Sequence, residues 1–394
     1  MPWRETCTME ERLKFLLDWE RGEVSVSELC RQYEVSRKTG YKWLHRRRSE
    51  GVAGLADRSR APLRHPQAMG AAVEAAVLEV RRRYPSWGAK KIRAHLERHY
   101  PALRRPAASS IGDLLRREGL TVPRRRRFRA SPRTAPFAGC DAANAVWCID
   151  FKGWFRLGDG TRCTPLTLAD AYSRYLLRCQ ALVGSDGGHV WPVLEAAFRE
   201  YGLPEVMRSD NGPPFASIAA GGLSPLAVRL VKAGVAPERI DPGQPQQNGR
   251  LERLHLTLKQ ETAMPPAASL RAQARHFREF RRIYNDIRPH EALGQTPPAE
   301  HYSASPRRYS GRLRSPDYPD HWQVRRVRHA GEIKWRGKLV YISATLSGEP
   351  VGIEEGEDGH FTVRFGPVTL GTIAPNSTLE RPKRKRRRAK PVRG

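Results

Sequence analysis

From residue 144 onward, strand-like and helix-like segments follow one another in an order that few folds can accommodate. Runs rich in Val, Ile, Trp and Phe predict three successive strands, because such side chains pack well on a pleated, half-buried surface. These strands are expected at residues 146–157, 164–169 and 175–183. A helix, a strand, a helix, a strand and a helix follow at residues 190–201, 205–209, 224–234, 235–240 and from about 248. This order predicts a mixed α/β sheet with helices packed on it.

The N-terminal 53 residues have a different pattern, in which short helices carry cap signals. Apolar residues at helical spacing predict a helix at residues 10–21. Ser25 and Glu28 form a capping-box pattern that opens a second helix, and Ser36 is a suitable N-cap for a third at residues 37–48. Two helices, a short turn and a further helix make the helix-turn-helix arrangement.

The third of these helices carries basic residues on one face. The residues expected to face the core are Leu29, Cys30 and Tyr33 on the second helix and Tyr41 and Leu44 on the third. Arg37, Lys38 and Lys42 then face outward, where they can contact DNA. The alternative is a charged face that is merely solvated. The complete three-helix pattern favours DNA binding.

Linker-like segments divide the rest of the chain. Helical patterns at residues 67–122 predict a second helix-turn-helix domain, and alternating segments separated by Gly-rich turns at residues 321–376 predict a small C-terminal β-barrel. The complete expected order is a helix-turn-helix domain at 1–53, a linker at 54–66, the second domain at 67–122, a basic linker at 123–142, the α/β region at 143–302, a linker at 303–320, the barrel at 321–376 and a basic tail at 377–394.

The charge balance identifies the class of partner. The 394 residues include 70 Lys and Arg against 41 Asp and Glu, giving a net charge of +29. Such an excess indicates a polyanionic partner, most simply nucleic acid, because release of counterions drives that binding; with the helix-turn-helix pattern, we expect double-stranded DNA. Hydrophobic residues are still 39% of the chain, which is enough for real cores.

The sequence also argues against several classes of protein. No run approaches the ~18 apolar residues of a membrane span, and no apolar signal core begins the chain, so we expect a soluble, intracellular protein without a membrane partner. The six cysteines are scattered without a C-x-x-C pair, which is untypical of structural zinc or of a disulfide framework. They are expected to be reduced thiols.

Asp150 interrupts an apolar run, between Ile149 and Phe151. A buried carboxylate costs several kcal/mol unless it is paired or binds a metal. An aspartate at a solvated strand end is the alternative, but the aromatic residues that continue past Asp150 favour a functional role.

Asp210 and Glu252 are each ambiguous when taken singly. Asp210 ends a predicted strand, where sites in open α/β sheets are found, but Ser-Asp-Asn-Gly is also an ordinary turn. Glu252 could be a helix-surface charge paired with Arg250 or Arg253, worth at most about 1 kcal/mol. Helical spacing puts Glu252, His255 and Lys259 on one face.

Together, Asp150, Asp210 and Glu252 suggest a metal site. A strand, a later strand end and a helix packed beside them can bring the three carboxylates together. Carboxylate oxygens suit hard divalent cations such as Mg²⁺, which keep open positions for substrate phosphate. Two such ions can activate one oxygen and stabilise the other in a phosphoryl displacement.

The motifs that contain these carboxylates also resemble a known family. The stretches WCIDFKGWF, LADAYSRYLL, RSDNGPPFAS and PQQNGRLERLHLTLK, in that order, resemble the integrase core of DDE transposases and retroviral integrases. The closing stretch YNDIRPHEALGQTPPAEHY is similar to the end of that core in bacterial insertion-sequence transposases. The resemblance covers residues 143–302, and the flanking helix-turn-helix units are typical of the group.

The resemblance implies a multidomain fold with helix-turn-helix units, an α/β ribonuclease-H-like core and a small β-barrel. It implies a divalent-metal-dependent DDE transposase with Asp150, Asp210 and Glu252 as the catalytic, metal-binding residues and two Mg²⁺ or Mn²⁺ ions. Lys259 matches a position that contacts the DNA end, and Arg250 and Arg253 are expected to bind DNA phosphates. The interval before Glu252 is longer than is usual in the family, and the insertion GGLSPLAVRLVKAG can absorb it.

The expected activity is cleavage of the ends of a mobile element and their joining to target DNA. Gathering two ends requires a homo-oligomer. The alternatives are a non-catalytic DNA-binding regulator and a nuclease of the same fold. Asp170 is interpreted as a turn and packing residue, and His255 and His290 are left outside the catalytic set because most such histidines are structural.

Overall fold

The computed structural model describes residues 7–60, 68–121, 140–241, 249–356, 360–373 and 378–381. The chain divides into two units, Met1–Ala68 and Met69–Gly394, and each is described by itself. The predicted basic linker at 123–142 and the basic tail at 377–394 lie largely outside the described residues.

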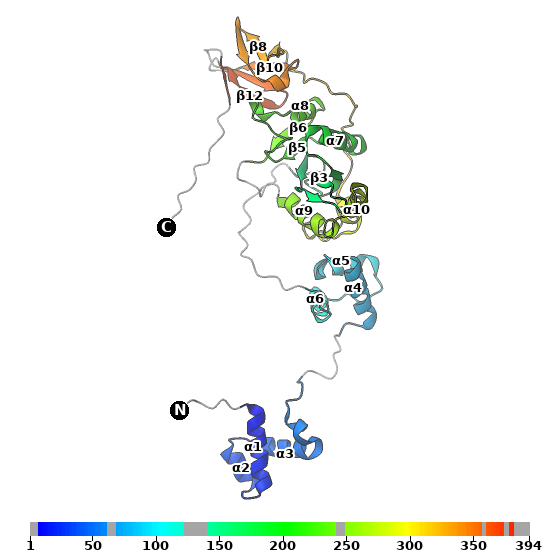
Figure 1. Ribbon diagram of the computed structural model, residues 1–394, viewed down its shortest axis with the longest axis vertical. Coiled ribbons are helices and arrows are strands. Elements are labelled where there is room, and N and C mark those ends of the chain that lie inside the picture. Colours follow the sequence, from blue (N-terminus) through cyan, green and yellow to red (C-terminus); the bar gives the residue numbers. More distant parts are fainter. Residues whose placement is uncertain are drawn as a thin grey trace, which may run out of the picture. The chain divides into compact units, whose positions relative to one another are not determined.

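Among its described residues, the first unit contains three α-helices and a 3-10 turn (Figure 1). Their bounds are α1 Thr8–Arg21, α2 Val26–Gln32, α3 Arg37–Glu50 and η1 Gly51–Leu55. Both predicted serine caps are present, because the backbone N–H of Glu28 donates to Ser25 Oγ and that of Thr39 donates to Ser36 Oγ. Each cap satisfies a backbone donor that the first helical turn leaves unpaired.

The three helices enclose a small apolar core of Phe15, Leu16, Leu29, Cys30, Trp43, Leu44 and Leu55. Leu55, which the sequence pattern assigns to the linker, is fully buried. The expectation that Tyr41 faces this core is wrong, since its side chain is 57% exposed. Gly40, Trp43 and Leu44 form the inward face instead, and a Cβ on Gly40 would lie 2.5 Å from Cys30 Sγ, so α2 and α3 pack too closely for a larger residue there.

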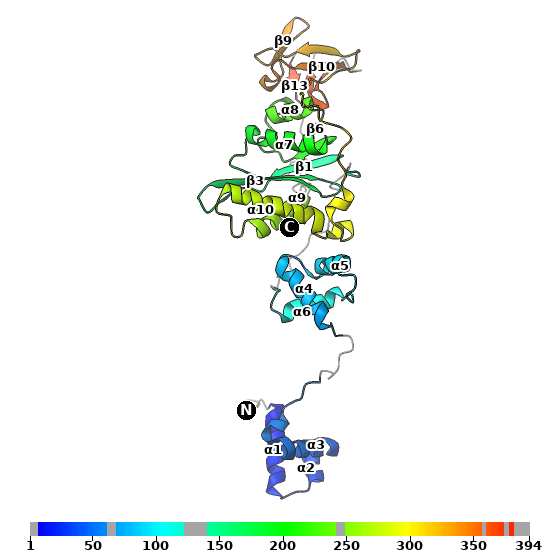
Figure 2. The ribbon, with the colours of Figure 1, turned by 90° about the vertical axis from the view of Figure 1, so that its right-hand side faces the viewer.

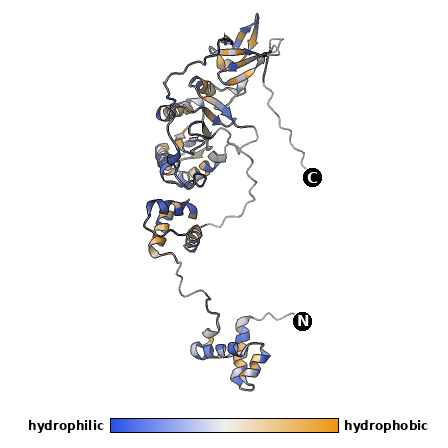
Figure 3. Ribbon diagram, turned by 180° about the vertical axis from the view of Figure 1, so that it is seen from behind, coloured by the Kyte–Doolittle hydropathy of each residue, from blue (hydrophilic) through white to orange (hydrophobic). Residues whose placement is uncertain are grey.

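The described part of the second unit begins with another group of three helices, within residues 67–122, where the sequence predicts a helical domain. They are α4 Ala71–Arg83, α5 Ala89–His99 and α6 Ala108–Arg117. Val77, Trp87, Ile92 and Ile111 form the centre of their core and are each at most 1% exposed. The helices of both N-terminal groups carry both hydrophobic and hydrophilic residues, as expected of helices with one buried face (Figure 3).

A mixed six-stranded sheet follows, with the order β2-β3-β1-β5-β6 and β4 paired to β3. The strands are β1 Val146–Phe151, β2 Phe155–Arg156, β3 Arg162–Asp170, β4 Leu176–Leu182, β5 Val206–Ser209 and β6 Ala236–Arg239. β3 is antiparallel to β1 and β4, whereas β5 is parallel to both β1 and β6. The predicted mixed sheet is therefore confirmed, and this strand arrangement is that of a ribonuclease-H-like core.

Helices cover both faces of this sheet (Figure 2). Their bounds are α7 Gly187–Tyr201, α8 Pro225–Lys232, α9 Gly249–Thr262 and α10 Leu270–Arg282, followed by short turns η4 Ile283–Ile287, η5 Glu291–Leu293 and η6 Pro298–His301. Alternation along β1 assigns its side chains to the two faces. Trp147 and Ile149 pack with α7 and α8, whereas Val146 and Cys148 pack with α9 and α10.

The C-terminal strands form two separate sheets among the described residues. The strands are β7 Gln323–Arg326, β8 Glu332–Trp335, β9 Lys338–Tyr341, β10 Pro350–Glu355, β11 Phe361–Phe365, β12 Val368–Ile373 and β13 Leu379–Glu380, with η7 Ala344–Leu346 between β9 and β10. Five of them have the order β13-β12-β11-β10-β7, and β8 pairs only with β9. The predicted β-barrel is not confirmed, because β7 and β13 are the two edges of this sheet and do not pair with each other.

These C-terminal strands share one hydrophobic core with the central sheet's helix α8. Val228 and Val231 of α8 pack with Ile333, Val351 and other buried strand residues. The contact is close, because a Cβ on Gly221, just before α8, would lie 2.8 Å from Val368 Cγ1.

Within the described part of the chain, no helix combines the length and apolar character needed to cross a membrane.

A buried histidine should make the fold sensitive to acid. His290 is 8% exposed, and burial, reinforced by Lys91 and Arg288, lowers the pKa of its ring to about 3. In the unfolded chain the His290 ring takes up a proton near pH 6.5, whereas in the folded chain it does so only near pH 3. The free energy of unfolding is therefore at its full value above pH 6.5 and falls as the pH drops towards 3. When the pH is lowered from 6.5 to 4.5, we expect the free energy of unfolding of His290→Leu to fall by about 2 kcal/mol less than that of the parent.

Urea denaturation at the two pH values measures this difference. His329→Asn is the control, because His329 is exposed and should leave the acid sensitivity unchanged. Equal losses of stability in the parent and in His290→Leu would contradict the prediction.

Candidate active site

Asp150 lies near the end of β1, on the sheet face that α9 covers. The alternation along the strand puts its side chain on the same face as Val146 and Cys148, which pack with that helix. The backbone N–H of Phe151 donates to Asp150 Oδ1 at 2.8 Å. Thr167 stands opposite Asp150 on β3, and its hydroxyl donates to the Asp150 carbonyl at 3.2 Å.

Asp210 is brought to Asp150 by the parallel pairing of β1 with β5. Cys148 lies opposite Arg208, so continuing the register by two residues sets Asp210 beside Asp150. Asp210 follows directly after β5 and accepts a hydrogen bond on Oδ1 from the backbone N–H of Gly212 at 3.2 Å. Two carboxylates therefore lie side by side at the C-terminal ends of adjacent strands.

Glu252 is contributed by the first turn of α9 and is exposed. Of the other residues predicted to share its face, Lys259 is exposed but His255 is buried, with 5% of its surface accessible. His255 Nε2 lies 2.7 Å from Thr167 Oγ1, and its Nδ1 lies 3.8 Å from Asp150 Oδ2. Burial, with a contribution from Lys152, lowers the pKa of His255 to about 4.

The three carboxylates interact electrostatically. The pKa of Asp150 is raised to about 7, first by burial and then by Asp210, with a smaller contribution from Glu252. The N–H of Phe151 and the charge of Lys152 oppose this rise only in part. An all-oxygen, mutually repelling donor set fits a hard divalent cation, which would relieve the repulsion.

The approach of Glu252 is less close than that of the two aspartates. In the described ranges, no group of three or more His, Cys, Asp or Glu side chains is gathered tightly enough to hold an ion. The structure thus brings Asp150 and Asp210 together and leaves Glu252 within electrostatic range of them. Asp170, by contrast, has a turn and packing role, since its buried carboxylate accepts hydrogen bonds from Asn144 and Ser173.

The predicted DNA-binding residues lie in two places. Arg37, Lys38 and Lys42 are exposed on α3 of the first unit, and Lys42 Nζ lies 4.3 Å from the centroid of the Trp43 ring. On α9, Arg253 and Lys259 are exposed. The side chain of Arg250 lies outside the described residues.

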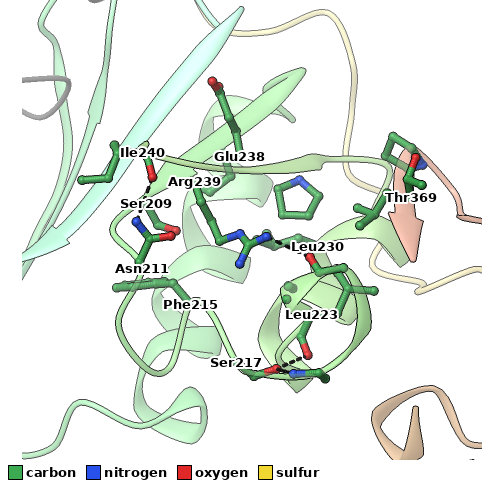
Figure 4. Close-up of a pocket in the computed structure, with 18 of the residues that line it drawn as sticks. Ser209, Asn211, Phe215, Ser217, Leu223, Leu230, Glu238, Arg239, Ile240 and Thr369 are labelled. Carbon is green, nitrogen blue, oxygen red and sulfur yellow. Dashed lines mark hydrogen bonds between the residues drawn. The ribbon is translucent and has the colours of Figure 1, made fainter. Parts of the chain in front are cut away.

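A cavity of about 710 Å³ lies beside Asp210, lined by Ser209 and Asn211 but by none of the three carboxylates. Several of its polar side chains form hydrogen bonds with backbone groups of the cavity lining itself (Figure 4). Asn211 Nδ2 donates to the Ile240 carbonyl at 2.8 Å, and Arg239 donates to the Gly221 carbonyl at 3.0 Å. These hydrogen bonds join segments of the cavity wall to one another, and one of them fixes Asn211, the residue after Asp210.

Sequence reasoning missed the contact of His255 with Asp150 and Thr167. The signal was present in part, because His255 follows Glu252 by three residues and therefore lies on the neighbouring turn. Thr167 gave no signal, since its partnership with Asp150 depends on the register of β3 against β1.

Comparison with protein families agrees with this architecture. The integrase core domain matches residues 141–245 and 233–298. A helix-turn-helix domain matches residues 11–62, and a homeodomain-like domain matches residues 39–115. The chain therefore contains segments that match the integrase core domain and helix-turn-helix domains, and it is similar to insertion-element proteins. Its integrase core and helix-turn-helix domains imply that it binds DNA.

Two insertion-element proteins illustrate the relationship. An uncharacterized 39.2 kDa protein of insertion element IS476 from Xanthomonas euvesicatoria is 28% identical over 287 residues, which are 72% of this chain and 79% of the relative. An uncharacterized 31.7 kDa protein of IS407 from Burkholderia multivorans is 32% identical over 189 residues, 48% of this chain and 66% of the relative.

Solved structures with matching regions include viral integrases. The HTLV-2 integrase catalytic core domain in complex with magnesium is 14% identical and has a TM-score of 0.33, covering 41% of this chain and 97% of its own. The simian T-cell lymphotropic virus intasome in complex with PP2A regulatory subunit B56 gamma is 13% identical and has a TM-score of 0.36, covering 76% of this chain and 99% of its own.

Replacing Asp150 in this integrase core should stabilise the metal-free protein at high pH. Because the pKa of Asp150 is raised, the folded chain keeps a proton that the unfolded chain releases, and stability falls as the pH rises from about 4 to 7. Asp150→Asn removes this penalty and preserves an oxygen for the Phe151 N–H. We expect a gain of up to about 4 kcal/mol at pH 8 and little change at pH 4.

Thermal or urea denaturation in EDTA at the two pH values tests the expectation. Asp113→Asn on α6, an exposed aspartate, is the control. A gain of the same size at both pH values, or none at pH 8, would show that Asp150 does not carry the repulsion.

Proposed function

We propose that this protein is a DNA transposase that cleaves the ends of a mobile element and joins them to target DNA. The observation that carries the proposal is the closeness of Asp150, near the end of β1, to Asp210, directly after the adjacent strand β5, with Glu252 in electrostatic range, in a segment that matches the integrase core domain. Proteins with this core domain are polynucleotidyl transferases. A pure DNA-binding protein would gain nothing from a buried carboxylate whose ionisation is opposed.

Asp150, Asp210 and Glu252 would hold two Mg²⁺ or Mn²⁺ ions. When bound, such ions activate the attacking oxygen and stabilise charge on the leaving oxygen. The chain's own contribution is to fix the carboxylates: the Phe151 N–H holds Asp150 Oδ1, and the Gly212 N–H holds Asp210 Oδ1. Fixed ligands reduce the reorganisation that the reaction requires.

The proposed reaction has two displacements. In the first, the oxygen of water bonds to a phosphorus at the element's end, and the bond from that phosphorus to the 3′ oxygen breaks and leaves a 3′-OH. In the second, that hydroxyl loses its proton and attacks a phosphorus of the target strand, which releases a new 3′-OH. Each step exchanges one P–O bond for another, so no energy source is needed.

Binding of the two DNA partners would involve separate surfaces. Arg37, Lys38 and Lys42 on the exposed side of α3 would contact the terminal repeats, since the recognition helix of a helix-turn-helix domain enters the major groove. Arg250, Arg253 and Lys259 on α9 would hold phosphates beside the carboxylates. Two element ends must be joined, so we propose a homo-oligomer that acts on the bacterial nucleoid in the cytoplasm.

Joining of a labelled terminal-repeat oligonucleotide to plasmid DNA in Mg²⁺ or Mn²⁺ tests the activity. We expect Asp150→Asn, Asp210→Asn and Glu252→Gln each to reduce cleavage and joining to the level seen in EDTA, because each removes one negatively charged ligand.

Glu279→Gln is the matched control, because Glu279 is an exposed carboxylate on α10 that pairs with Arg282. Unimpaired joining by any of the three variants would remove that residue from the site. Cleavage by the parent without any joining would instead identify a nuclease.

Lys259 should contribute to DNA affinity through phosphate alone. We expect Lys259→Ala to weaken binding to terminal-repeat and scrambled duplexes alike and to reduce the slope of log K against log salt by about 0.9. Fluorescence anisotropy in EDTA between 50 and ~200 mM salt measures both quantities. Lys259→Arg preserves the charge and should keep the parental slope, whereas an unchanged slope in Lys259→Ala would exclude a phosphate contact.

A further inference from the structure

His255 stands at the junction of three elements that the proposed chemistry depends on. It extends from α9 to β1 and β3, with Nε2 2.7 Å from Thr167 Oγ1 and Nδ1 3.8 Å from Asp150 Oδ2. Thr167 is itself bound to Asp150, because its hydroxyl lies 3.2 Å from the Asp150 carbonyl oxygen. Of the two polar neighbours of the ring, one is the Asp150 carboxylate and the other, Thr167, is hydrogen-bonded to the Asp150 carbonyl.

Packing alone does not account for a histidine at this place. The inward face of α9 is otherwise formed by Leu251, Leu254 and Leu258, each at most 3% exposed. An imidazole among leucines loses its hydration, and this loss is offset only where the ring nitrogens find partners. A leucine would fill the same face without that cost, so the polar contacts are the reason to look for a role.

The proton positions allow two arrangements, and both leave His255 between Thr167 and Asp150. When the Thr167 hydroxyl donates to the Asp150 carbonyl, its oxygen can accept from Nε2–H of the ring. When the hydroxyl turns towards Nε2, the ring carries its proton on Nδ1, which faces Asp150 Oδ2. In either arrangement, Nδ1 stands 3.8 Å from Oδ2, longer than a hydrogen bond, so the ring borders the space open to that oxygen.

We propose that His255 is a positioning residue that holds the Asp150 carboxylate in place relative to Glu252. Glu252 lies three residues earlier on the same helix, so a single ring ties the helix that carries one carboxylate to the strand that carries another. Asp150 Oδ1 is already fixed by the Phe151 N–H, and His255 faces the remaining oxygen. This role rests on the proposed function, since it supposes that these carboxylates bind a divalent cation.

The role predicts a loss of metal affinity that does not depend on DNA or on turnover. Partners behind metal ligands typically contribute about 10- to 100-fold to affinity. We therefore expect His255→Leu to weaken Mn²⁺ binding to the full-length, DNA-free protein by about 10- to 100-fold. Electron paramagnetic resonance of free Mn²⁺ measures this affinity directly, and the Mn²⁺ concentration for half-maximal cleavage should rise by a similar factor.

Two polar variants separate the contacts of the ring. His255→Asn places an amide near the position of Nδ1 and keeps the side that faces Asp150, whereas His255→Gln reaches the position of Nε2 and keeps the side that faces Thr167. We expect Asn to restore more of the Mn²⁺ affinity than Gln. These variants also carry the test if His255→Leu does not fold.

His290→Leu is the matched control, because His290 is buried to a similar extent, at 8% exposure, but contacts none of the three carboxylates through any described hydrogen bond or ion pair. It should leave the Mn²⁺ affinity unchanged. An equal loss in His290→Leu, or equal affinities in the parent and all His255 variants, would overturn the positioning role.

Failure of the proposed function gives a different result. A parent protein that binds no Mn²⁺ refutes the metal-dependent transposase itself. A parent that binds Mn²⁺ but joins no DNA, with weaker binding in His255→Leu, refutes the joining activity and supports the role of His255.

Discussion

The parallel pairing of β1 with β5 is the constraint on which the candidate site depends. It sets Asp150 and Asp210 next to each other at the ends of two strands that are otherwise buried among apolar side chains. The pairing brings like charges together, and the pKa of Asp150 rises to about 7 as a result of burial and of this neighbour. The surrounding core tolerates the arrangement because the helices on both faces stabilise the strands independently of the carboxylates.

Much of this architecture was predictable from local patterns. Ser25, Ser36 and Pro225 begin helices where their chemistry predicts, because cap hydrogen bonds and the fixed proline φ act within a single turn. The strand runs were equally clear, since alternation and β-branched content are local properties. Asp150 was recognisable because a charge in an apolar run is a conflict that only function or pairing resolves.

The missed features depend on contacts between distant segments. The sequence pattern places Tyr41 inward with Leu44, whereas the close packing of Gly40 against Cys30 turns α3 so that Gly40, Trp43 and Leu44 face the core. The link of His255 to Thr167 requires the register of β3, which no local pattern encodes. Barrel closure likewise depends on whether β7 meets β13, and edge pairing is a property of the assembled sheet.

The shared core of α8 and the C-terminal strands couples the segment between Asp210 and Glu252 to the far end of the chain. Val228 and Val231 belong to that segment, and they are covered by strands that follow residue 320. The two segments therefore depend on each other for burial. Removal of the C-terminal strands would expose the apolar face of α8 to water, and removal of α8 would expose the apolar core of those strands.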